Sequence, residues 1–417
     1  MQHYGARSHG SHRGNSNPIA SACGGVLFGL LLIFSSVPLL WWNEGNAVSW
    51  YTSLNEALSE VKSLEEPVRE GRYEGSLVHV VGTTFGATLQ DEEFGVASEN
   101  ALAIRRVVEM YSWVEDRDTR TERDSQGNER QHTTYRYSKK WSSTVQDSSH
   151  FNENYRGEYN NPASLPFRER TFSSSVRVGP RGSAKGGFEL SERLRSQLLH
   201  WEELYVSATG TSSSSGSNAV VAASSPKGFR AVDGALYHSA SGGKISANSP
   251  RVGDTRVTFQ KVTGGRTVSL IAQQSGKYLT PYRTSTGKEI ALTAGRADSA
   301  TNMIAMEVSA TASTTWICRA LGFGMMFFGL LLTTTPINMI VSFLNYIPLV
   351  GPLATSIVSF ATSMFAFVTA VFCSVIVIAA SWFAHRPMLA VSLVAGAVGL
   401  FFALGQFTQR HSTRKDY

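Results

Sequence analysis

A catalytic site requires a nucleophile, a base and an orienting partner, or metal ligands at workable spacing, and this chain contains neither pattern. The histidines between the apolar segments are scattered: His79, His132, His150, His200 and His238. Two acids, Glu109 and Glu115, share one face of a predicted strand, but exposed charges on a half-buried strand account for them without catalysis. We therefore expect that the protein is not an enzyme and has no catalytic, cofactor-binding or metal-binding residues.

The cysteines and the histidines of the N-terminal tail give no stronger chemical signal. Cys23, Cys318 and Cys373 all lie inside or at the edge of hydrophobic segments, so the polar middle of the chain has no disulfide framework. Histidines also occur in the tail, but scattered histidines are common in polar tails and need no metal: His3, His9 and His12. The middle of the chain must then fold around an ordinary hydrophobic core.

Long uncharged segments determine the class of the protein. The stretch Ala320–Ala384 contains no Asp, Glu, Lys or Arg. Because roughly 20 residues of helix cross a bilayer core about 30 Å thick, this stretch is long enough for two membrane helices. Apolar segments also occupy Gly24–Trp42 and Pro387–Gln406. We expect four transmembrane helices, at 23–42, 315–336, 351–384 and 387–406.

The segment 337–350 interrupts the longest apolar stretch. It contains Asn338, Asn345 and Pro348, which favour a connector, an interfacial helix or a re-entrant piece. A full crossing here would change the number of spans and place the termini on opposite sides. The prediction of four spans depends on this segment not crossing.

Both ends of the chain are basic. Residues 1–22 form a polar tail that we expect to be disordered, and 407–417 form a second basic tail. Because positive flanks favour the cytoplasmic side, both termini are predicted there, and the polar middle on the far side: lumen, perinuclear space or periplasm. Basic residues in that middle are interspersed with acids, so no nucleic-acid partner is expected.

The middle region, 43–314, is predicted to be a β-rich α+β domain between spans 1 and 2. An amphipathic pattern over Ala47–Leu64 indicates a helix that packs on this domain or lies on the lipid surface. Leucines in Gly187–Trp201 indicate a second helix, and the Ser/Gly/Ala-rich stretch 210–226 indicates a flexible loop.

Period-two patterns predict the strands of this domain. Thr255–Val262 and Thr267–Ala272 flank Gly264-Gly265, which indicates a tight hairpin. Arg105–Val114 and Thr133–Val145 are predicted to pair, with the charged residues between them forming a long solvated connection. The aromatic residues of this pair would form either a stacking platform for a ligand or, as we favour, cross-strand packing: Tyr111, Trp113, Tyr135, Tyr137 and Trp141.

Small residues within the spans predict close helix packing. Gly25 and Gly29 lie on one face of the first span, and the last span has a similar set at Ala395, Gly399 and Ala403. Such faces favour a homo-oligomer assembled through the membrane helices. Transport is less well supported, because ionisable residues within spans usually mark an ion path and these spans contain almost none. A pore lined by neutral residues in an oligomer remains the alternative.

Several short motifs resemble those of the transmembrane protein 43 (LUMA) family. The residues that carry the resemblance, and that we take as candidate motif or interface residues, are Asn43, Glu44, Gly45, Arg105, Arg106, Glu109, Tyr111, Trp113, Tyr135, Tyr137, Trp141, Arg386 and Pro387. The likeness also includes Glu74–His79, Asn161-Pro162, Val252–Asp254 and Thr315-Trp316, and it extends from about residue 24 to residue 405. The N-terminal tail and the stretch 210–226 depart from the family.

The resemblance implies a non-enzymatic scaffold of the endoplasmic reticulum and inner nuclear membrane, with its middle domain in the lumen. It also implies self-association through the spans and a place near lamins and emerin in animals. Its partners would then be the lipid bilayer, other copies of the chain, and nuclear-envelope or other membrane proteins. The alternative function is a channel or an accessory subunit of a larger membrane complex.

Overall fold

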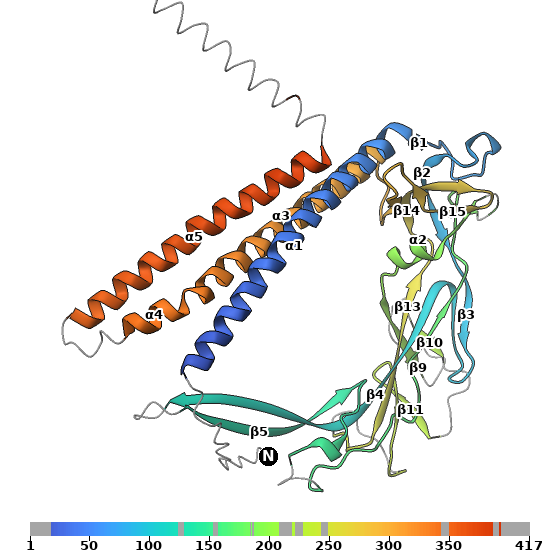
Figure 1. Ribbon diagram of the computed structural model, residues 1–417. Coiled ribbons are helices and arrows are strands. Elements are labelled where there is room, and N and C mark those ends of the chain that lie inside the picture. The colour runs from blue at the N-terminus through green and yellow to red at the C-terminus, as the bar shows by residue number, and fades with distance from the viewer. Residues whose placement is uncertain are drawn as a thin grey trace, which may run out of the picture. The chain divides into compact units, whose positions relative to one another are not determined.

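Strands and long helices separate into two units in the computed structural model of the chain (Figure 1). The structure describes residues 18–123, 129–152, 157–183, 185, 187–207, 219–221, 228–242, 249–342, 350–386 and 392. We call the described parts of Glu60–Tyr282 and Glu289–Met303 the β unit. The described parts of Asn15–Ser59, Arg283–Lys288 and Ile304–Tyr417 form the helical unit.

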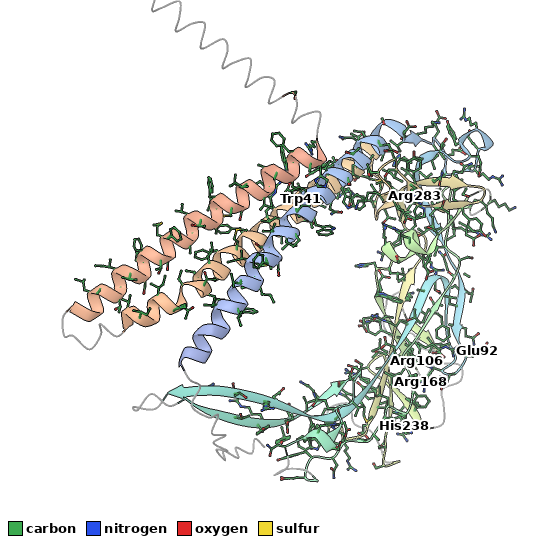
Figure 2. All side chains as sticks on the ribbon, viewed as in Figure 1. Trp41, Glu92, Arg106, Arg168, His238 and Arg283 are labelled. Atoms are coloured by element: carbon green, nitrogen blue, oxygen red, sulfur yellow. The ribbon has the colours of Figure 1, made fainter. Side chains whose placement is uncertain are left out.

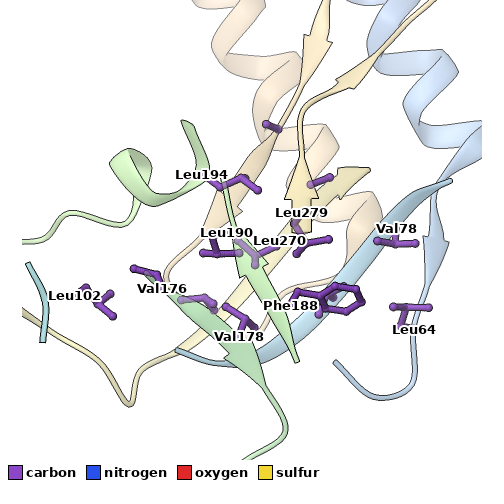
Figure 3. Close-up of a cluster of buried hydrophobic side chains, with 14 of the residues drawn as sticks. Leu64, Val78, Leu102, Val176, Val178, Phe188, Leu190, Leu194, Leu270 and Leu279 are labelled. Atoms are coloured by element: carbon purple, nitrogen blue, oxygen red, sulfur yellow. The ribbon is translucent and has the colours of Figure 1, made fainter. Parts of the chain in front are cut away.

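One sheet of the β unit closes on itself. It has the strand order β1 (Lys62–Ser63), β2 (Leu77–Phe85), β7 (Arg177–Gly179), β8 (Phe188–Leu190), β15 (Tyr278–Thr280), β14 (Thr267–Ser275) and β18 (Leu292–Ala294). An additional pairing of β2 with β14 joins five of these strands in a ring, which leaves none of the five with a bare edge in the ring. Its buried core includes Val78, Phe188 and Leu270 (Figure 3).

The second sheet is built on β4 and β13. It contains β3 (Ala87–Asp91), β4 (Val96–Arg123), β5 (Glu129–Ser142), β6 (Arg170–Ser173), β9 (Glu202–Ser207), β10 (Ala219–Val221), β11 (Phe229–Val232), β12 (Ala235–His238) and β13 (Thr255–Thr263). Phe94 and Phe259 are fully buried in its core. The small elements η1 (Gly71–Tyr73), η2 (Ser148–His150), β16 (Tyr282–Arg283) and β17 (Glu289–Ile290) complete the strands and turns.

The hairpin predicted around Gly264-Gly265 is wrong, although both of its strands exist. β13 pairs with β4, β9 and β12, whereas β14 pairs with β2, β15 and β18, so the chain passes from one sheet to the other between them. The amides of Gly264 and Gly265 donate to the carbonyls of Asn100 and Thr84, not across a turn. Distant strands that pair along both edges of β13 and β14 outcompete the local pairing.

The pair of strands β4 and β5 was predicted correctly, but its connection was not. Residues 115–123 and 129–132 continue the ladder, and the register extends from Met110 opposite Ser142 to Arg123 opposite Glu129. Thr119, Thr121 and Thr133 are β-branched, which favours extended backbone despite the surrounding charges. Residues 115–123 and 129–132 therefore form a two-stranded ribbon where a loop was expected.

The helix predicted over Gly187–Trp201 is much shorter in the structure. Only α2, Glu192–Gln197, is helical. The preceding residues Phe188–Leu190 form β8, which pairs with β7 and β15, so tertiary strand pairing overrides the leucine spacing. Leu194 is the buried residue of α2.

His79 makes the stability of the β unit depend on pH. Its ring is 5 % exposed, its Nε2 lies 3.0 Å from the carbonyl oxygen of Asp298, and its Nδ1 lies 3.2 Å from Ser63 Oγ. Burial lowers the pKa of His79 below its ordinary value, and the hydrogen bond with Asp298 opposes part of that shift. The unfolded chain therefore binds the proton first as pH falls.

We expect the neutral His79 ring to contribute stability that is complete above about pH 6.5 and lost as pH falls toward its lower folded-state pKa. Thermal unfolding of the wild type should then fall more steeply between about pH 7.5 and about pH 5.5 than that of His79→Gln, whose neutral amide does not titrate. Parallel curves for the two proteins would assign the acid sensitivity to other groups.

The helical unit contains α1 (Pro18–Glu60), α3 (Ala300–Thr333), α4 (Thr335–Ser342) and α5 (Val350–His385). Within the described residues, three helices are long and apolar enough to cross a membrane: Gly24–Glu60, Ala300–Ile337 and Leu353–His385. The first span and the amphipathic segment that follows it form one continuous helix, because nothing between Trp42 and Ala47 breaks it. The fourth predicted span lies outside the described residues, with Pro387, Ala395, Gly399 and Ala403.

The amphipathic end of α1 packs against the segment Arg283–Lys288. The backbone amide of Ser285 donates to both carboxylate oxygens of Glu56 at 3.0 Å, and Lys288 Nζ donates to Asn46 Oδ1 at 2.7 Å. Ser53 Oγ lies 2.9 Å from Thr284 Oγ1. These polar contacts favour protein packing over the lipid-surface alternative for this part of the helix.

Contacts between the helices of the helical unit show in which direction each helix runs relative to the others. Gly29 meets Gly329, and Glu44 meets Arg319, so α1 and α3 are antiparallel. Trp382, near the end of α5, also contacts Glu44, so α5 returns toward the end from which α3 started (Figure 1). α3 and α5 are therefore antiparallel to each other.

Gly29 is in close contact with another helix of the same chain. A Cβ atom on Gly29 would lie 2.6 Å from the carbonyl oxygen of Gly329 and 2.9 Å from Leu332 Cβ, whereas one on Gly25 would only reach Thr335 at 3.8 Å. The close packing expected at Gly29 is therefore present between α1 and α3. Gly29 is not free to contact a second copy of the protein.

Gly29→Ala is expected to destabilise the helical unit by about 1–3 kcal/mol, because the new methyl group overlaps backbone that cannot move aside. Gly324→Ala is the matched control, since its Cβ would have no neighbour within 4 Å. Alanine should be neutral or slightly stabilising there because it is the better helix former. Detergent-solubilised protein unfolded by heat would measure both, and equal melting temperatures would contradict the assigned packing.

Candidate functional site

Three helices of the helical unit meet at the carboxylate of Glu44. Arg319 of α3 donates from Nε to Oε1 at 2.6 Å and from Nη2 to Oε2 at 2.7 Å, which is a bidentate ion pair. Trp382 of α5 donates from its indole Nε1 to Oε2 at 2.8 Å. The Glu44 side chain is 2 % exposed and that of Arg319 is 19 % exposed. We call Asn43, Glu44, Arg319 and Trp382 the Glu44 cluster.

The neighbours of Glu44 on α1 complete the junction. Asn43 Nδ2 lies 3.3 Å from the carbonyl oxygen of Thr315 on α3 and 3.4 Å from Glu44 Oε1. Gly45 has no room for a side chain, because a Cβ there would lie 2.5 Å from His385 Nε2. Ser381 Oγ of α5 donates to the carbonyl oxygen of Trp41 at 3.1 Å. Each residue of the Asn43-Glu44-Gly45 motif thus has a separate role in joining the helices.

Tryptophans surround the cluster on the outside of the helices. Trp41, Trp42, Trp316 and Trp382 are all more than 40 % exposed. Indole rings favour the level of the lipid headgroups, where one end of the ring is apolar and the other is wet. The cluster therefore lies where the apolar part of the helices ends. A buried carboxylate at this depth requires a counter-charge, and Arg319 provides it.

A cavity of about 230 Å³ lies beside the cluster. It is formed entirely within the helical unit by Glu44, Ala47, Val48, Tyr51, Ala312, Thr315, Trp316, Arg319, Trp382 and Arg386. The guanidinium of Arg319 lies 4.8 Å from the centre of the Trp316 ring, and that of Arg386 lies 5.1 Å from the centre of the Trp382 ring. Arg319 and Arg386 thus each place a guanidinium on a tryptophan ring at the same cavity.

The candidate residues of the β unit serve its internal packing. Arg106 is 3 % exposed and forms ion pairs with Asp91 at 3.1 Å and Glu93 at 2.5 Å, while its Nε donates to the carbonyl oxygen of Arg168 (Figure 2). Burial raises the pKa of Asp91, and the charge of Arg106 opposes that shift. Arg105 instead points outward, to Gln260 and over the ring of Trp201.

Glu109 and Glu115 do not converge on a common site. Glu109 accepts two hydrogen bonds from Arg256, at 3.0 and 2.6 Å. Glu115 accepts from Tyr137 Oη at 2.6 Å and from the backbone amide of Asn152 at 2.7 Å. Both carboxylates are engaged in interactions that hold strands and loops together.

The aromatic residues of β4 and β5 pack in small groups. The rings of Tyr111 and Trp141 lie 5.3 Å apart, and Trp113 contacts Tyr159 at 4.7 Å. Tyr137 stacks on Tyr159 at 4.1 Å. Tyr135 is instead covered by a cation: Arg117 lies 5.8 Å from the centre of its ring. These contacts favour cross-strand packing over a ligand platform.

Arg319 and Trp382 are the site residues that the sequence did not single out. A lone glutamate directly after one span and a lone arginine within the first residues of the next carried a usable signal, since both charges lie near the same membrane boundary. The contact also needs α1 and α3 to be neighbours, which spacing alone does not establish. Within the part of the chain that the structure describes, no group of three His, Cys, Asp or Glu residues could hold a metal ion.

Comparison with known proteins identifies relatives along most of the chain. The family model described as "Transmembrane protein 43" matches residues 110–387. "Transmembrane protein 43" of Homo sapiens is 28 % identical over 395 residues, covering 91 % of this chain and 88 % of that protein. "Transmembrane protein 43 homolog" of Drosophila melanogaster is 28 % identical over 378 residues, covering 89 % of this chain and 92 % of its own length.

"Transmembrane protein 43" of Mus musculus is likewise 28 % identical over 389 residues, covering 89 % of this chain and 87 % of that protein. No solved structure matches the chain. The family model covers more than half of the chain, and its residues include Arg319 and Trp382 as well as the strands that carry the aromatic motifs. The relatives extend the similarity over the N-terminal part as well, and the chain belongs to the transmembrane protein 43 family.

Proposed function

We propose that the protein is a non-enzymatic membrane scaffold of the endoplasmic reticulum and nuclear envelope. One observation carries this proposal: both oxygens of Glu44 are used to join three apolar helices, so the most buried acid among the described residues of the helical unit serves assembly. Each oxygen of this carboxylate accepts two hydrogen bonds, Oε1 from Arg319 and Asn43 and Oε2 from Arg319 and Trp382, which leaves no free lone pair aimed at a substrate. The helical unit is thus suited to hold a large β unit at a membrane.

Self-association belongs to the same proposal and uses a surface that is exposed among the described helices. Gly29 already packs against α3 of the same chain, so α5 supplies the contact between copies instead. Its large exposed residues include Leu353, Ile357, Phe360, Phe365, Phe372 and Ile376. Within a bilayer such a face contacts either lipid tails or another apolar helix. A homo-oligomer would place several β units side by side for nuclear-envelope or other membrane partners.

Placement in the membrane follows from the basic flanks. In the proposed topology the chain ends lie in the cytoplasm or nucleoplasm and the β unit lies in the lumen. Protease protection of intact microsomes, with a separate epitope tag at each end, tests this directly. Both tags should be digested while the β unit is protected, and digestion of only one tag would rule out the proposed number of crossings.

Native mass distinguishes a scaffold from its rivals. The full chain is extracted in mild detergent, its mass is measured by light scattering, and co-purifying proteins are identified. A homo-oligomer, or a complex with nuclear-envelope proteins, is the expected result. Ion conductance after reconstitution into planar bilayers would favour the channel alternative instead. A monomer without partners would contradict the proposal.

A further inference from the structure

We propose that the cavity beside the Glu44 cluster binds the phosphate of an anionic phospholipid headgroup. The lining residues combine two arginines with Tyr51, Thr315 and two tryptophans in a space of about 230 Å³. That is enough room for a phosphate and part of its glycerol. Arginine recognises phosphate through parallel N–H donors in a planar fork.

The charges in the cavity favour an anion. Glu44 is neutralised by Arg319, whose Nε and Nη2 are both committed to it. Arg386 forms no ion pair with any carboxylate in the described parts of the chain, and its guanidinium lies against the ring of Trp382. One positive charge is therefore left over, and it borders the same cavity as Glu44.

The same geometry disfavours a choline or ammonium ligand. A quaternary ammonium group needs an open aromatic face or an unpaired carboxylate. Here Arg319 and Arg386 already cover one face of Trp316 and of Trp382, and both oxygens of Glu44 already accept hydrogen bonds. Zwitterionic lipids would gain only the phosphate contact and would bring an unpaired cation next to Arg386.

A lipid fits the site better than free phosphate because apolar surface continues from the cavity. Trp316 lines the cavity, and Ile317 and Leu321 follow it along α3 toward the apolar part of the helix; all three are between 56 and 68 % exposed. An acyl chain would cover these side chains while its headgroup stays at the level of the tryptophans. Free phosphate gains none of that contact.

Native mass spectrometry of the delipidated full-length protein tests the proposal. Dioleoyl phosphatidic acid, dioleoyl phosphatidylcholine or inorganic phosphate is titrated, and the bound fraction is counted for the wild type and for Arg386→Gln. We expect phosphatidic acid to bind best and Arg386→Gln to bind it about tenfold more weakly, as for loss of one charged hydrogen bond. Arg386→Lys should retain most of the affinity, since it keeps the charge.

Arg181→Gln is the matched control, because Arg181 is an exposed arginine of the β unit and its loss should leave lipid binding unchanged. Equal affinity of Arg386→Gln and the wild type would overturn the proposal, as would equal binding of phosphatidylcholine. Saturation by inorganic phosphate at the same concentration would assign the site to free phosphate and would overturn the lipid assignment. Oligomer mass is read from the same spectra, so loss of lipid selectivity with unchanged mass leaves the scaffold proposal standing.

Discussion

Replacing Glu44 with glutamine is expected to lower the free energy of unfolding of the helical unit by about 3–5 kcal/mol, which is the typical penalty for leaving a buried charge without its partner. Arg319 would keep its guanidinium in the junction while losing both charge-assisted hydrogen bonds. Trp382 would lose the carboxylate that accepts from its indole. Helicity of the detergent-solubilised protein, followed by circular dichroism during denaturation, measures the change.

Glu60→Gln is the control for this experiment, because Glu60 is an exposed glutamate of the same helix. We expect it to change stability by no more than about 0.5 kcal/mol. The double variant Glu44→Gln, Arg319→Gln removes both charges and should recover part of the loss, giving a coupling energy between the two sites. Additive effects of the two substitutions would show that the ion pair does not join the helices.

The β unit contains a second buried charge, and Arg106→Gln should destabilise it by about 3–5 kcal/mol. Asp91, which is 1 % exposed, would lose its counter-charge. Glu93 would lose its partner as well, but its side chain is 45 % exposed and water can replace the arginine there. Near-ultraviolet circular dichroism follows unfolding of this aromatic-rich unit.

Arg105→Gln is the neighbouring control. Arg105 is part-buried and contacts Gln260 and Trp201, so its loss should affect stability by about 1 kcal/mol or less. A comparable loss for both variants would mean that burial of Arg106 is not the cause.

The effect of Arg106→Gln should also depend on pH. Burial already raises the pKa of Asp91, and removing Arg106 removes the charge that opposes the shift. A raised folded-state pKa adds stability below the unfolded value and loses it as pH rises. The gap between variant and wild type is therefore expected to widen from about pH 4 to about pH 7. A gap that narrows over that range would contradict the assigned role of Asp91.

Local patterns predicted the strands better than their partners. β13 and β14 were both expected near their observed bounds, because alternation of buried and exposed residues is a property of neighbouring positions. They do not form a hairpin, because β13 pairs with β4 and β14 pairs with β2, and both partners are long strands from distant parts of the sequence. The helix expected around Leu190 is replaced there by strand β8 for the same reason, because β8 pairs with the distant strand β15.

The candidate residues show a similar division. Asn43, Glu44 and Gly45 were singled out as a motif, and their surroundings in the structure assign each a contact. Arg319 was not singled out, since no spacing rule connects it with Glu44. Gly29 was expected to allow close helix packing, and α3 packs against it in the structure, but the sequence offered no means of choosing between α3 and a second copy.

The sequence by itself determined that this is a membrane protein with long apolar helices and a β-rich region between the first and second of them. It could do so because hydrophobicity accumulates along a segment, and a run without charge is favourable in a bilayer whatever surrounds it. Only the tertiary structure decided which helices meet, which strands pair, and that Glu44, Arg319 and Trp382 form one junction. Those contacts depend on surfaces brought together from distant parts of the chain, where competing pairings of similar local quality are separated only by burial and by the need of each buried charge for a partner.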